Sequence, residues 1–210
     1  MARRSFAGKT VLVTGAGGGL GRAVALRFAQ AGARIAALDK DATGIESLSV
    51  EIADRGGQCL ALPCDITDAE ACAQAVAATV QHFGTLDVLV NNAGMSQRSG
   101  FAVTDLAVIR RVMDVNFYGA VHCTKAALPH LVAARGLIVS VSSVAGYTPL
   151  IARTGYAASK HAMHGFFESL RTELAPAGVD VMMVCPSFIA TRIDRNALGG
   201  DGQPVRHAQV

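Results

Sequence analysis

Residues 10–21 read Thr10-Val-Leu-Val-Thr-Gly-Ala-Gly-Gly-Gly-Leu-Gly21, a short apolar run followed at once by a turn rich in glycine. The apolar run is typical of a buried strand, and Leu20, Val24 and Phe28 repeat at the spacing of one helix face. The glycines between them allow a tight turn and let an anion approach the free N–H groups at the start of the helix. A strand, a glycine-rich turn and a helix in this order predict the first unit of an α/β sheet that holds a pyrophosphate.

The rest of the chain repeats this alternation of short apolar runs and longer helical stretches. Further strands are expected at residues 34–38, 59–64, 86–90, 137–141 and 179–184, and helices at 42–55, 68–83, 105–134 and 156–174. Strands that alternate with helices predict a parallel sheet, and near-continuous apolar strands predict that both of its faces are buried. We therefore predict an α/β fold, a single Rossmann-like, doubly wound parallel sheet with helices on both faces. Residues 1–210 are expected to form one dinucleotide-binding catalytic domain, truncated or disordered after about residue 195.

Asp39 ends the second expected strand, 24 residues after Gly15. A carboxylate at this place can accept hydrogen bonds from the adenosine ribose and repels a 2′-phosphate, which favours NAD over NADP. Lys40 follows directly and can partly accommodate a phosphate, so NADP remains an alternative. A simple loop aspartate is the other interpretation of Asp39.

Composition and charge argue against several other classes of protein. The formal net charge is +3 and no basic run exceeds two residues, so nucleic acid is not expected as a partner. No apolar run approaches the ~20 residues that span a bilayer, so no membrane partner is expected. The five cysteines contain no Cys-x-x-Cys pair, which indicates a reducing cytoplasm and neither a disulfide scaffold nor a zinc site. His161 and His164 are expected at the surface or in a dimer contact, and not on a metal.

Tyr156 and Lys160 are four residues apart and therefore share one helix face. A free tyrosine has a pKa of about 10, and a nearby lysine cation lowers that pKa by favouring the phenolate. Ser143, thirteen residues upstream at the end of an expected strand, can hold a substrate oxygen against the phenol. This set predicts proton transfer to or from an alcohol or a ketone. A packed tyrosine beside an exposed lysine is the structural alternative.

Together, these motifs resemble the short-chain dehydrogenase/reductase family over essentially residues 7–191. The resemblance rests on motifs in the family's order, which are Thr14-Gly-x-x-x-Gly-x-Gly21, Asp65-Ile66, Asn91-Asn92-Ala93-Gly94, Val115-Asn116, Val139-Ser-Val-Ser-Ser143 and Tyr156-x-x-x-Lys160. It implies an NAD(P)-dependent oxidoreductase, a short-chain alcohol dehydrogenase or ketoreductase, that interconverts a ketone or aldehyde and an alcohol by hydride transfer. The cofactor it implies is NAD, with NADP as the alternative.

The resemblance also implies a role for each matching residue. Tyr156 would be the general acid in reduction and the general base in oxidation, and Lys160 would lower its pKa and bind the nicotinamide ribose. Ser143, rather than Ser142, would bind the substrate oxygen, and Asn116 would hold a water that links Lys160 to solvent. The implied cofactor-binding residues are Gly15, Gly19, Leu20, Gly21, Asp39, Asp65, Ile66, Asn92, Ala93, Gly94, Tyr156, Lys160, Ile189 and Thr191. For Asn92 and Asn116, a purely structural role is the alternative.

The chain departs from the family's pattern at Ser187. The family has glycine after this proline, and a serine fits poorly if the backbone needs a positive φ. Family members also continue further, with helices that cover the substrate and a final strand.

The substrate pocket is expected to be mostly apolar. Met95, Leu150 and Ile151 flank the catalytic residues with few charges. Arg98 or Arg153 could bind an acidic substrate, but a solvated arginine is the preferred interpretation of both.

The resemblance implies a homodimer, or a tetramer with a longer C-terminus, with Phe166, Phe167 and Leu170 as candidate contacts. Two other functions fit the same fold. One is a non-catalytic dinucleotide sensor or partner-binding protein, and the other is a lyase or epimerase that keeps its cofactor bound.

Overall fold

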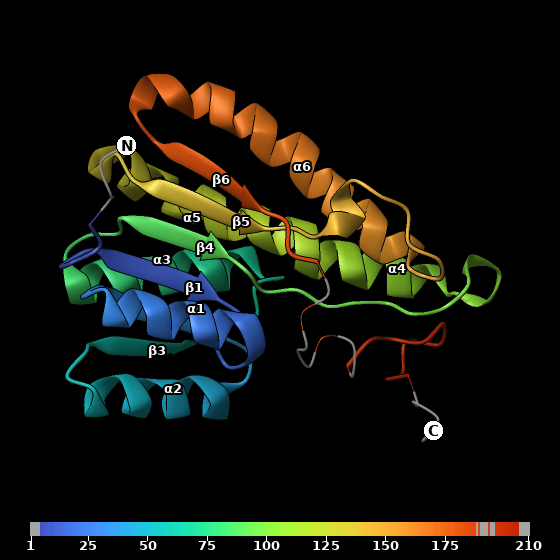
Figure 1. Cartoon of the computed structure of the whole chain (residues 1–210), viewed down its shortest axis with the longest axis horizontal. Helices are drawn as coiled ribbons and strands as arrows, with labels where there is room; N and C mark the ends of the chain where they lie inside the picture. The colour runs from blue at the N-terminus through green and yellow to red at the C-terminus, as the bar shows by residue number, and fades with distance from the viewer. Residues whose placement is uncertain (1–4, 188, 190–192, 194–195, 206–210) are drawn as a thin grey trace.

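Six parallel strands form the centre of the molecule. The structure is a computed structural model that describes residues 5–187, 189, 193 and 196–205. Its strands are β1 (Thr10–Thr14), β2 (Arg34–Asp39), β3 (Cys59–Pro63), β4 (Val88–Asn91), β5 (Leu137–Val141) and β6 (Asp180–Val184). They lie in the order β3-β2-β1-β4-β5-β6, and every neighbouring pair is parallel (Figure 1). Because the order reverses between β1 and β4, the loops after these strands diverge and open the crevice where such sheets bind ligands.

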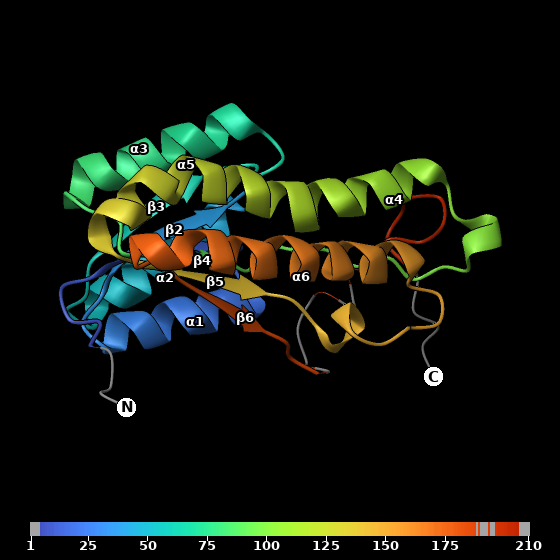
Figure 2. The same ribbon diagram turned by 90° about the horizontal axis from the view of Figure 1, so that it is seen from above.

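Helices cover both faces of this sheet (Figure 2). α1 (Gly19–Gln30) and α2 (Ala42–Asp54) share one buried cluster with Val11 and Val13 of β1. α3 (Ala69–Phe83), α5 (Gly119–Ala134) and α6 (Thr154–Leu174) share the other cluster with Leu12. Successive side chains of one strand therefore pack into the hydrophobic clusters on opposite faces of the sheet, because side chains alternate between the two faces along a strand. The doubly wound sheet predicted from the sequence is confirmed.

The ends of α3 follow from local chemistry. The Asp68 carboxylate accepts hydrogen bonds from the backbone N–H groups of Glu70 and Ala71, at 2.8 and 3.1 Å. These bonds satisfy donors that have no partner within the helix. Gly84 ends the helix with a φ of 80°, a left-handed conformation that glycine adopts without strain.

The region predicted as one helix over residues 105–134 is helical but not uniform. α4 (Leu106–Met113) continues through a π-helical turn at Asp114–Tyr118 into α5. A π turn inserts one residue into the helix, and such turns occur frequently at functional sites. Asn116 lies in this turn and is fully buried.

Residues 196–205 pack against the chain that follows β4. The Leu198 N–H donates to the Ser96 carbonyl at 2.9 Å, and the Leu198 carbonyl accepts from the Arg98 N–H at 2.8 Å. Ala197 and Leu198 are buried. The disorder expected after about residue 195 therefore does not apply to residues 196–205, because backbone hydrogen bonds and apolar burial hold this segment in place.

Candidate functional site

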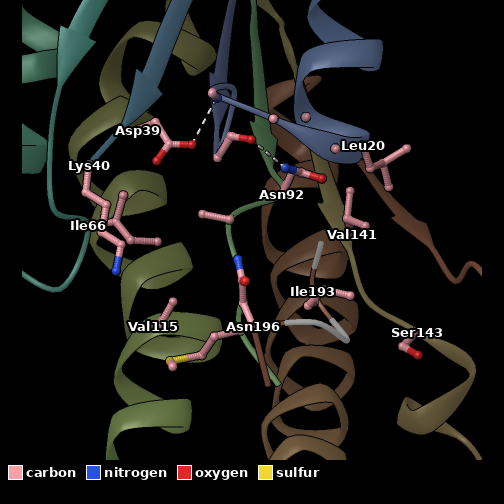
Figure 3. Close-up of a pocket in the computed structure, with 18 of the residues that line it drawn as sticks. Leu20, Asp39, Lys40, Ile66, Asn92, Val115, Val141, Ser143, Ile193 and Asn196 are labelled. Atoms are coloured by element: carbon pink, nitrogen blue, oxygen red, sulfur yellow. Dashed lines mark hydrogen bonds between the residues drawn. The ribbon is translucent and has the colours of Figure 1, made fainter. Parts of the chain in front are cut away.

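A cavity of about 660 Å³ opens at the carboxyl ends of the central strands. Figure 3 shows Asp39 and Lys40 at one end of it and Ser143 and Asn196 at the other. Most of the site residues predicted from the sequence line this one cavity, namely Gly15, Gly19, Leu20, Gly21, Asp39, Asp65, Ile66, Asn92, Ala93, Gly94, Ser143, Tyr156, Lys160 and Ile189. Asn116 lies behind its wall, and Thr191 lies outside the described residues.

The glycine-rich loop needs glycine at two positions for different reasons. Gly15 has a φ of 68°, which L side chains rarely adopt. At Gly21 the φ is unremarkable for a helix, but an added Cβ would lie 2.0 Å from the Gly15 carbonyl oxygen. The first turn of α1 therefore packs closely against the Gly15 carbonyl. The start of α1 faces the cavity. This arrangement fits a dinucleotide pyrophosphate, which such loops hold through backbone N–H groups.

Thr14 and Asn92 hold the loop after β1 against the loop after β4. The Asn92 amide donates to the carbonyl oxygens of Thr14 and Gly15, at 2.9 and 3.3 Å. In return, the Thr14 hydroxyl accepts from the backbone N–H groups of Asn92 and Ala93, both at 3.0 Å. Asn92 thus ties the two loops together, which is a structural role of the kind named as the alternative for it. No role of its own was expected for Thr14, although it is the first residue of the glycine motif.

Asp39 reaches from β2 to the glycine loop. One carboxylate oxygen accepts from the Gly17 N–H at 2.9 Å, and the other accepts from the Asp41 N–H at 3.0 Å. Both bonds fix a negative charge at the edge of the cavity, beside Lys40. This end of the cavity thus has a carboxylate, that of Asp39, which is held in place by backbone N–H donors. A carboxylate in this position can accept hydrogen bonds from the two hydroxyls of a ribose.

Asp65 and Ile66 form the next part of the wall. The backbone N–H and the hydroxyl of Thr67 both donate to Asp65, and these bonds lower the pKa of its carboxyl. Ile66 is buried, and an added Cβ on Gly119 would lie 2.5 Å from its Cδ1 atom. Gly119 thus lets α5 approach closely enough to fix the apolar side chain. Arg111 of α4 also lines this cavity, and nothing in its local sequence indicated that.

Asn116 is held by three hydrogen bonds to protein atoms. Its Oδ1 accepts from the Met95 N–H at 2.8 Å, and its Nδ2 donates to the Met95 carbonyl at 3.0 Å and to the Ser159 hydroxyl at 2.9 Å. Ser159 donates in turn to the Tyr156 carbonyl at 2.7 Å. The π turn, the loop after β4 and the N-terminal part of α6 are therefore joined through one amide. Ser159 was missed because a serine inside a helix carries no local signal of such a role.

Lys160 is buried, and its ammonium group donates to the Val141 carbonyl at 2.9 Å. Burial lowers its pKa to about 8, from a usual value near 10.5. The Nζ atom lies 5.8 Å from the centre of the Tyr156 ring. The predicted pair thus meets on the inner side of α6. The alternative of an exposed lysine is wrong, because this lysine is enclosed between α6 and the end of β5.

Ser142 and Ser143, the two serines after β5, have different neighbours. Ser143 lines the cavity, and its hydroxyl oxygen accepts from the Ala145 N–H at 3.2 Å. Ser142 also touches the cavity, but its hydroxyl lies 3.0 Å from the Nε2 atom of His164. The choice of Ser143 as the residue for a substrate oxygen stays a prediction. His164 is half-buried on α6, and its expected place at the surface or in a dimer contact stays a prediction.

The chain after β6 closes the far side of the cavity. Ser187 and Ile189 both line it. Among the described residues other than glycine, Arg135 and Ala152 have a positive φ. Ser187 is therefore free of the backbone strain considered for it. Leu198 and Asn196 complete this wall. They could not be assigned from sequence, because only their packing against the loop after β4 brings them here.

Metal binding and membrane crossing find no support in the described part of the chain. No group of three or more His, Cys, Asp or Glu side chains is arranged to hold a metal ion in residues 5–187, 189, 193 and 196–205. Within the same residues, no helix combines the length and the apolar character needed to cross a membrane.

The fold and this cavity define a Rossmann-like protein with a glycine loop at the strand-order reversal, and comparison with known proteins supplies its family. The profile of the short chain dehydrogenase family matches residues 9–200. The chain belongs to the short-chain dehydrogenase/reductase family.

Curated and solved relatives agree with this assignment. Dehydrogenase/reductase SDR family member 7B of Rattus norvegicus is 40% identical over 200 residues, which are 91% of this chain and 61% of the relative. A short chain dehydrogenase/reductase from Burkholderia phymatum, solved in complex with NAD, has a TM-score of 0.88 and 28% identity, and the match covers 91% of this chain and 70% of the other. A dehydrogenase/reductase from Sinorhizobium meliloti 1021 has a TM-score of 0.86 and 34% identity, with 97% and 77% covered. The chain thus spans about three fifths of the rat relative.

Proposed function

We propose that this chain is an NAD(P)-dependent oxidoreductase that interconverts a ketone or aldehyde and an alcohol. The observation that carries the proposal is the shared cavity, which begins at the glycine loop and Asp39 and ends at Ser143, Tyr156 and Lys160. A dinucleotide laid along it, pyrophosphate at the glycine loop and adenosine ribose at Asp39, brings its nicotinamide to the Ser143 end. The fit of a dinucleotide to this cavity rests on the glycine loop, where the Gly15 carbonyl leaves no room for a Cβ atom on Gly21.

The chain's own residues would handle the proton, while the nicotinamide supplies or accepts the hydride. In reduction, the Tyr156 hydroxyl gives its proton to the carbonyl oxygen, and in oxidation it takes the proton from the alcohol. The Ser143 hydroxyl donates a hydrogen bond to the same oxygen and so orients it. Lys160, still mostly protonated at neutral pH with a pKa of about 8, favours the tyrosine's anionic form.

Asn116 enters the proposal in two ways. Its amide holds the Met95 backbone and Ser159, so it positions the first turn of α6 from which Tyr156 projects. Both of its N–H donors are used in these bonds, but Oδ1 keeps a second lone pair. A relay water that links Lys160 to solvent would therefore bind as a donor to that oxygen.

We further propose NAD as the preferred cofactor. The Asp39 carboxylate is fixed by two backbone donors and cannot turn away from the ribose. A 2′-phosphate would lie against this charge. Lys40 lines the same end and is the residue that would moderate the repulsion. The Burkholderia phymatum relative in complex with NAD supports this choice.

The proposed substrate is a small, mostly apolar carbonyl compound or its alcohol. Figure 3 shows the uncharged side chains of Val141, Ile193 and Asn196 in the same cavity as Ser143. Arg153, the alternative for binding an acidic substrate, donates instead to the Ser96 hydroxyl at 2.7 Å. A substrate carboxylate would therefore compete with an existing hydrogen bond.

The proposal includes a cytoplasmic homodimer, or a tetramer if a longer C-terminus takes part. Phe167 is fully buried in the core and cannot contact a second copy. Phe166 and Leu170 are only partly buried on α6 and remain candidates. Light scattering at micromolar protein that gives the mass of one chain would contradict the dimer.

The decisive experiment follows reduced nicotinamide by absorbance with a panel of ketones and alcohols, using wild type and Tyr156→Phe. We expect turnover in the wild type, a loss of about a thousandfold or more in the variant, and little change in NADH affinity, because only the proton donor is removed. Full activity of Tyr156→Phe would overturn the mechanism. Tight NADH binding without turnover on any compound would favour the sensor, and product formation without net cofactor change would favour a lyase or epimerase.

A further inference from the structure

Four polar side chains meet beside the proposed dinucleotide cavity. They come from four places in the chain, Ser142 after β5, Tyr147 in the loop that follows, His164 on α6 and Cys185 directly after β6. Of these, only Ser142 also lines the cavity in the described part of the chain. The proposed reaction uses none of the other three, so the cluster needs a separate explanation.

The centre of the cluster is the Nε2 atom of His164. It lies 3.7 Å from the Cys185 sulfur and 3.0 Å from the Ser142 hydroxyl oxygen. The Tyr147 hydroxyl lies 3.9 Å from the same sulfur, and the rings of Tyr147 and His164 are 4.2 Å apart. The thiol is thus in hydrogen-bond contact with an imidazole, and the imidazole is held between a ring and a hydroxyl.

An imidazole beside a thiol is an arrangement that activates cysteine. The thiolate, not the thiol, is the nucleophile, and a neighbouring base that takes the proton raises its supply. Burial lowers the pKa of His164, so its ring is neutral near pH 7 and free to accept a proton. Among the described residues, the charged groups that act on the cluster lie on α6. Glu168 raises the pKa values of His164 and Tyr147, whereas Lys160 and His161 lower that of His164 and Arg171 lowers that of Tyr147.

The other four cysteines lack this surrounding. Cys64, Cys72 and Cys123 are buried together under α3 and α5, and Cys59 is partly exposed on β3. Burial raises the pKa of Cys59 to about 11. Cys185 is therefore the partly exposed thiol with an imidazole in contact, and Cys59 is a partly exposed thiol whose pKa is raised. Cys59 can therefore serve as an internal control for the reactivity of Cys185.

We propose that Cys185 is a site of covalent thiol modification, activated by His164, and that its oxidation by hydrogen peroxide stops turnover in the adjacent cavity. The second half of this statement rests on the proposed oxidoreductase function, and the first half does not.

The chemical step balances with peroxide as the oxidant. His164 takes the thiol proton, and the sulfur attacks one peroxide oxygen. An S–O bond forms as the O–O bond breaks, and the departing hydroxide takes the proton and leaves as water. Cysteine is oxidised by two electrons to the sulfenic acid, and peroxide is reduced to water.

A modified sulfur would reach Ser143 through the neighbours of Cys185, which are tightly packed around His164. An added Cβ on Gly146 would lie 2.5 Å from the His164 ring and 2.9 Å from the Ser142 hydroxyl. Cys185 also lies between two backbone bonds, from Ser142 N–H to Val184 O at 2.8 Å and from Val144 N–H to Pro186 O at 3.1 Å. An oxidised sulfur would alter the contact with His164 and press on residues 142–147, the segment that carries Ser143.

The first test labels the folded protein with substoichiometric iodoacetamide near pH 7 and counts modified cysteines by peptide mass spectrometry. We expect Cys185 to react about tenfold faster than Cys59 in the wild type, and at a rate similar to Cys59 in His164→Phe. Phenylalanine keeps a ring against Tyr147 but has no base. Labelling of the three buried cysteines would reveal an unfolded variant, for which His164→Gln is the replacement. Equal rates at Cys185 and Cys59 in the wild type, or no effect of His164→Phe, would overturn the proposal.

The second test treats wild type and Cys185→Ser with hydrogen peroxide and measures turnover and NADH affinity. We expect Cys185→Ser to keep its basal turnover and to resist peroxide, while the wild type loses activity in step with sulfenic acid at Cys185. Inactivation of both proteins at one rate would overturn the inhibitory half. If the untreated wild type shows no turnover, the proposed function fails, while labelling still decides whether Cys185 is activated.

Discussion

At the residue scale, hydrogen bonds fix the orientation of the Asp39 carboxylate, and burial lowers the pKa of Lys160. Asp39 is fixed by the N–H groups of Gly17 and Asp41, so its charge has one orientation. Lys160 is enclosed, and its pKa falls to about 8. Each of these states leads to a measurable consequence.

Replacing Asp39 should change the choice of cofactor. In Asp39→Ser we expect the ratio of kcat/KM for NAD to that for NADP to fall about a hundredfold, or ~3 kcal/mol, because a fixed charge no longer repels the 2′-phosphate. Asp41→Ser is the matched control, since it removes the same charge from a neighbouring cavity residue. An equal shift in both variants would show that general charge, and not the Asp39 position, decides the preference.

Replacing Lys160 should stabilise the free protein at neutral pH. Its pKa is lower in the folded chain than in the unfolded chain, so burying the charged form costs about 3 kcal/mol at pH 7. Lys160→Met removes this cost but loses the bond to Val141, and we expect a net gain of about 2 kcal/mol in the free energy of unfolding.

The pH dependence of this gain has a definite sign. The loss of stability caused by Lys160 in the wild type is complete below about pH 8 and shrinks as the pH rises. It disappears above about pH 10.5, where the lysine is neutral in both the folded and the unfolded state. Urea unfolding of both proteins at several pH values measures it. A difference that is constant with pH would contradict the lowered pKa of Lys160.

At the element scale, the joint between β1 and α1 depends on one close approach. Gly21 lies in the first turn of α1, and the absence of a Cβ atom there leaves space for the Gly15 carbonyl oxygen. Gly18, three residues earlier, has an extended backbone, and an added Cβ there would meet nothing within 4 Å. The same motif therefore contains one glycine required by packing and another that packing does not require.

Two alanine substitutions separate these glycines. Gly21→Ala should lower the free energy of unfolding by about 3 kcal/mol, since the new methyl overlaps a carbonyl oxygen. Gly18→Ala should change it by less than about 1 kcal/mol. Thermal or urea unfolding without cofactor measures both. Equal effects would contradict the packing assigned to Gly21.

At the scale of the whole molecule, the cavity joins segments from most of the sheet's carboxyl edge to Ile193, Asn196 and Leu198. A ligand that spans it contacts the ends of β1, β2, β4 and β5 and the chain after β6 at once. Its binding should therefore stabilise the fold as one unit and not a single loop.

Thermal unfolding with NADH tests this coupling. At about a hundred times its Kd, NADH should add about 2.7 kcal/mol to the free energy of unfolding, which raises the Tm by roughly 5–10 °C in a chain of this size. AMP at the same excess over its own Kd is the control for simple mass action. A Tm unchanged by saturating NADH would exclude this cavity as the dinucleotide site.

Much of this arrangement could be predicted from local patterns. The β1 run and its glycines, the cap at Asp68 and the helical spacing of Tyr156 and Lys160 are each set by neighbours in the chain, so periodicity and turn chemistry reveal them. The π turn at Asp114–Tyr118 was not apparent from these patterns, and its Asn116 bonds to the Met95 backbone, 21 residues away in the chain.

Residue type at short spacing was enough to specify the class of fold, the dinucleotide loop and the residues proposed for proton transfer. The partners of individual side chains required the folded chain. Folding placed Ser159 on Asn116, Leu198 against Ser96 and His164 on Cys185, contacts between residues 21 to 102 positions apart. Such pairings arise when buried polar groups find partners across the sheet's edge, and that depends on the packing of whole elements.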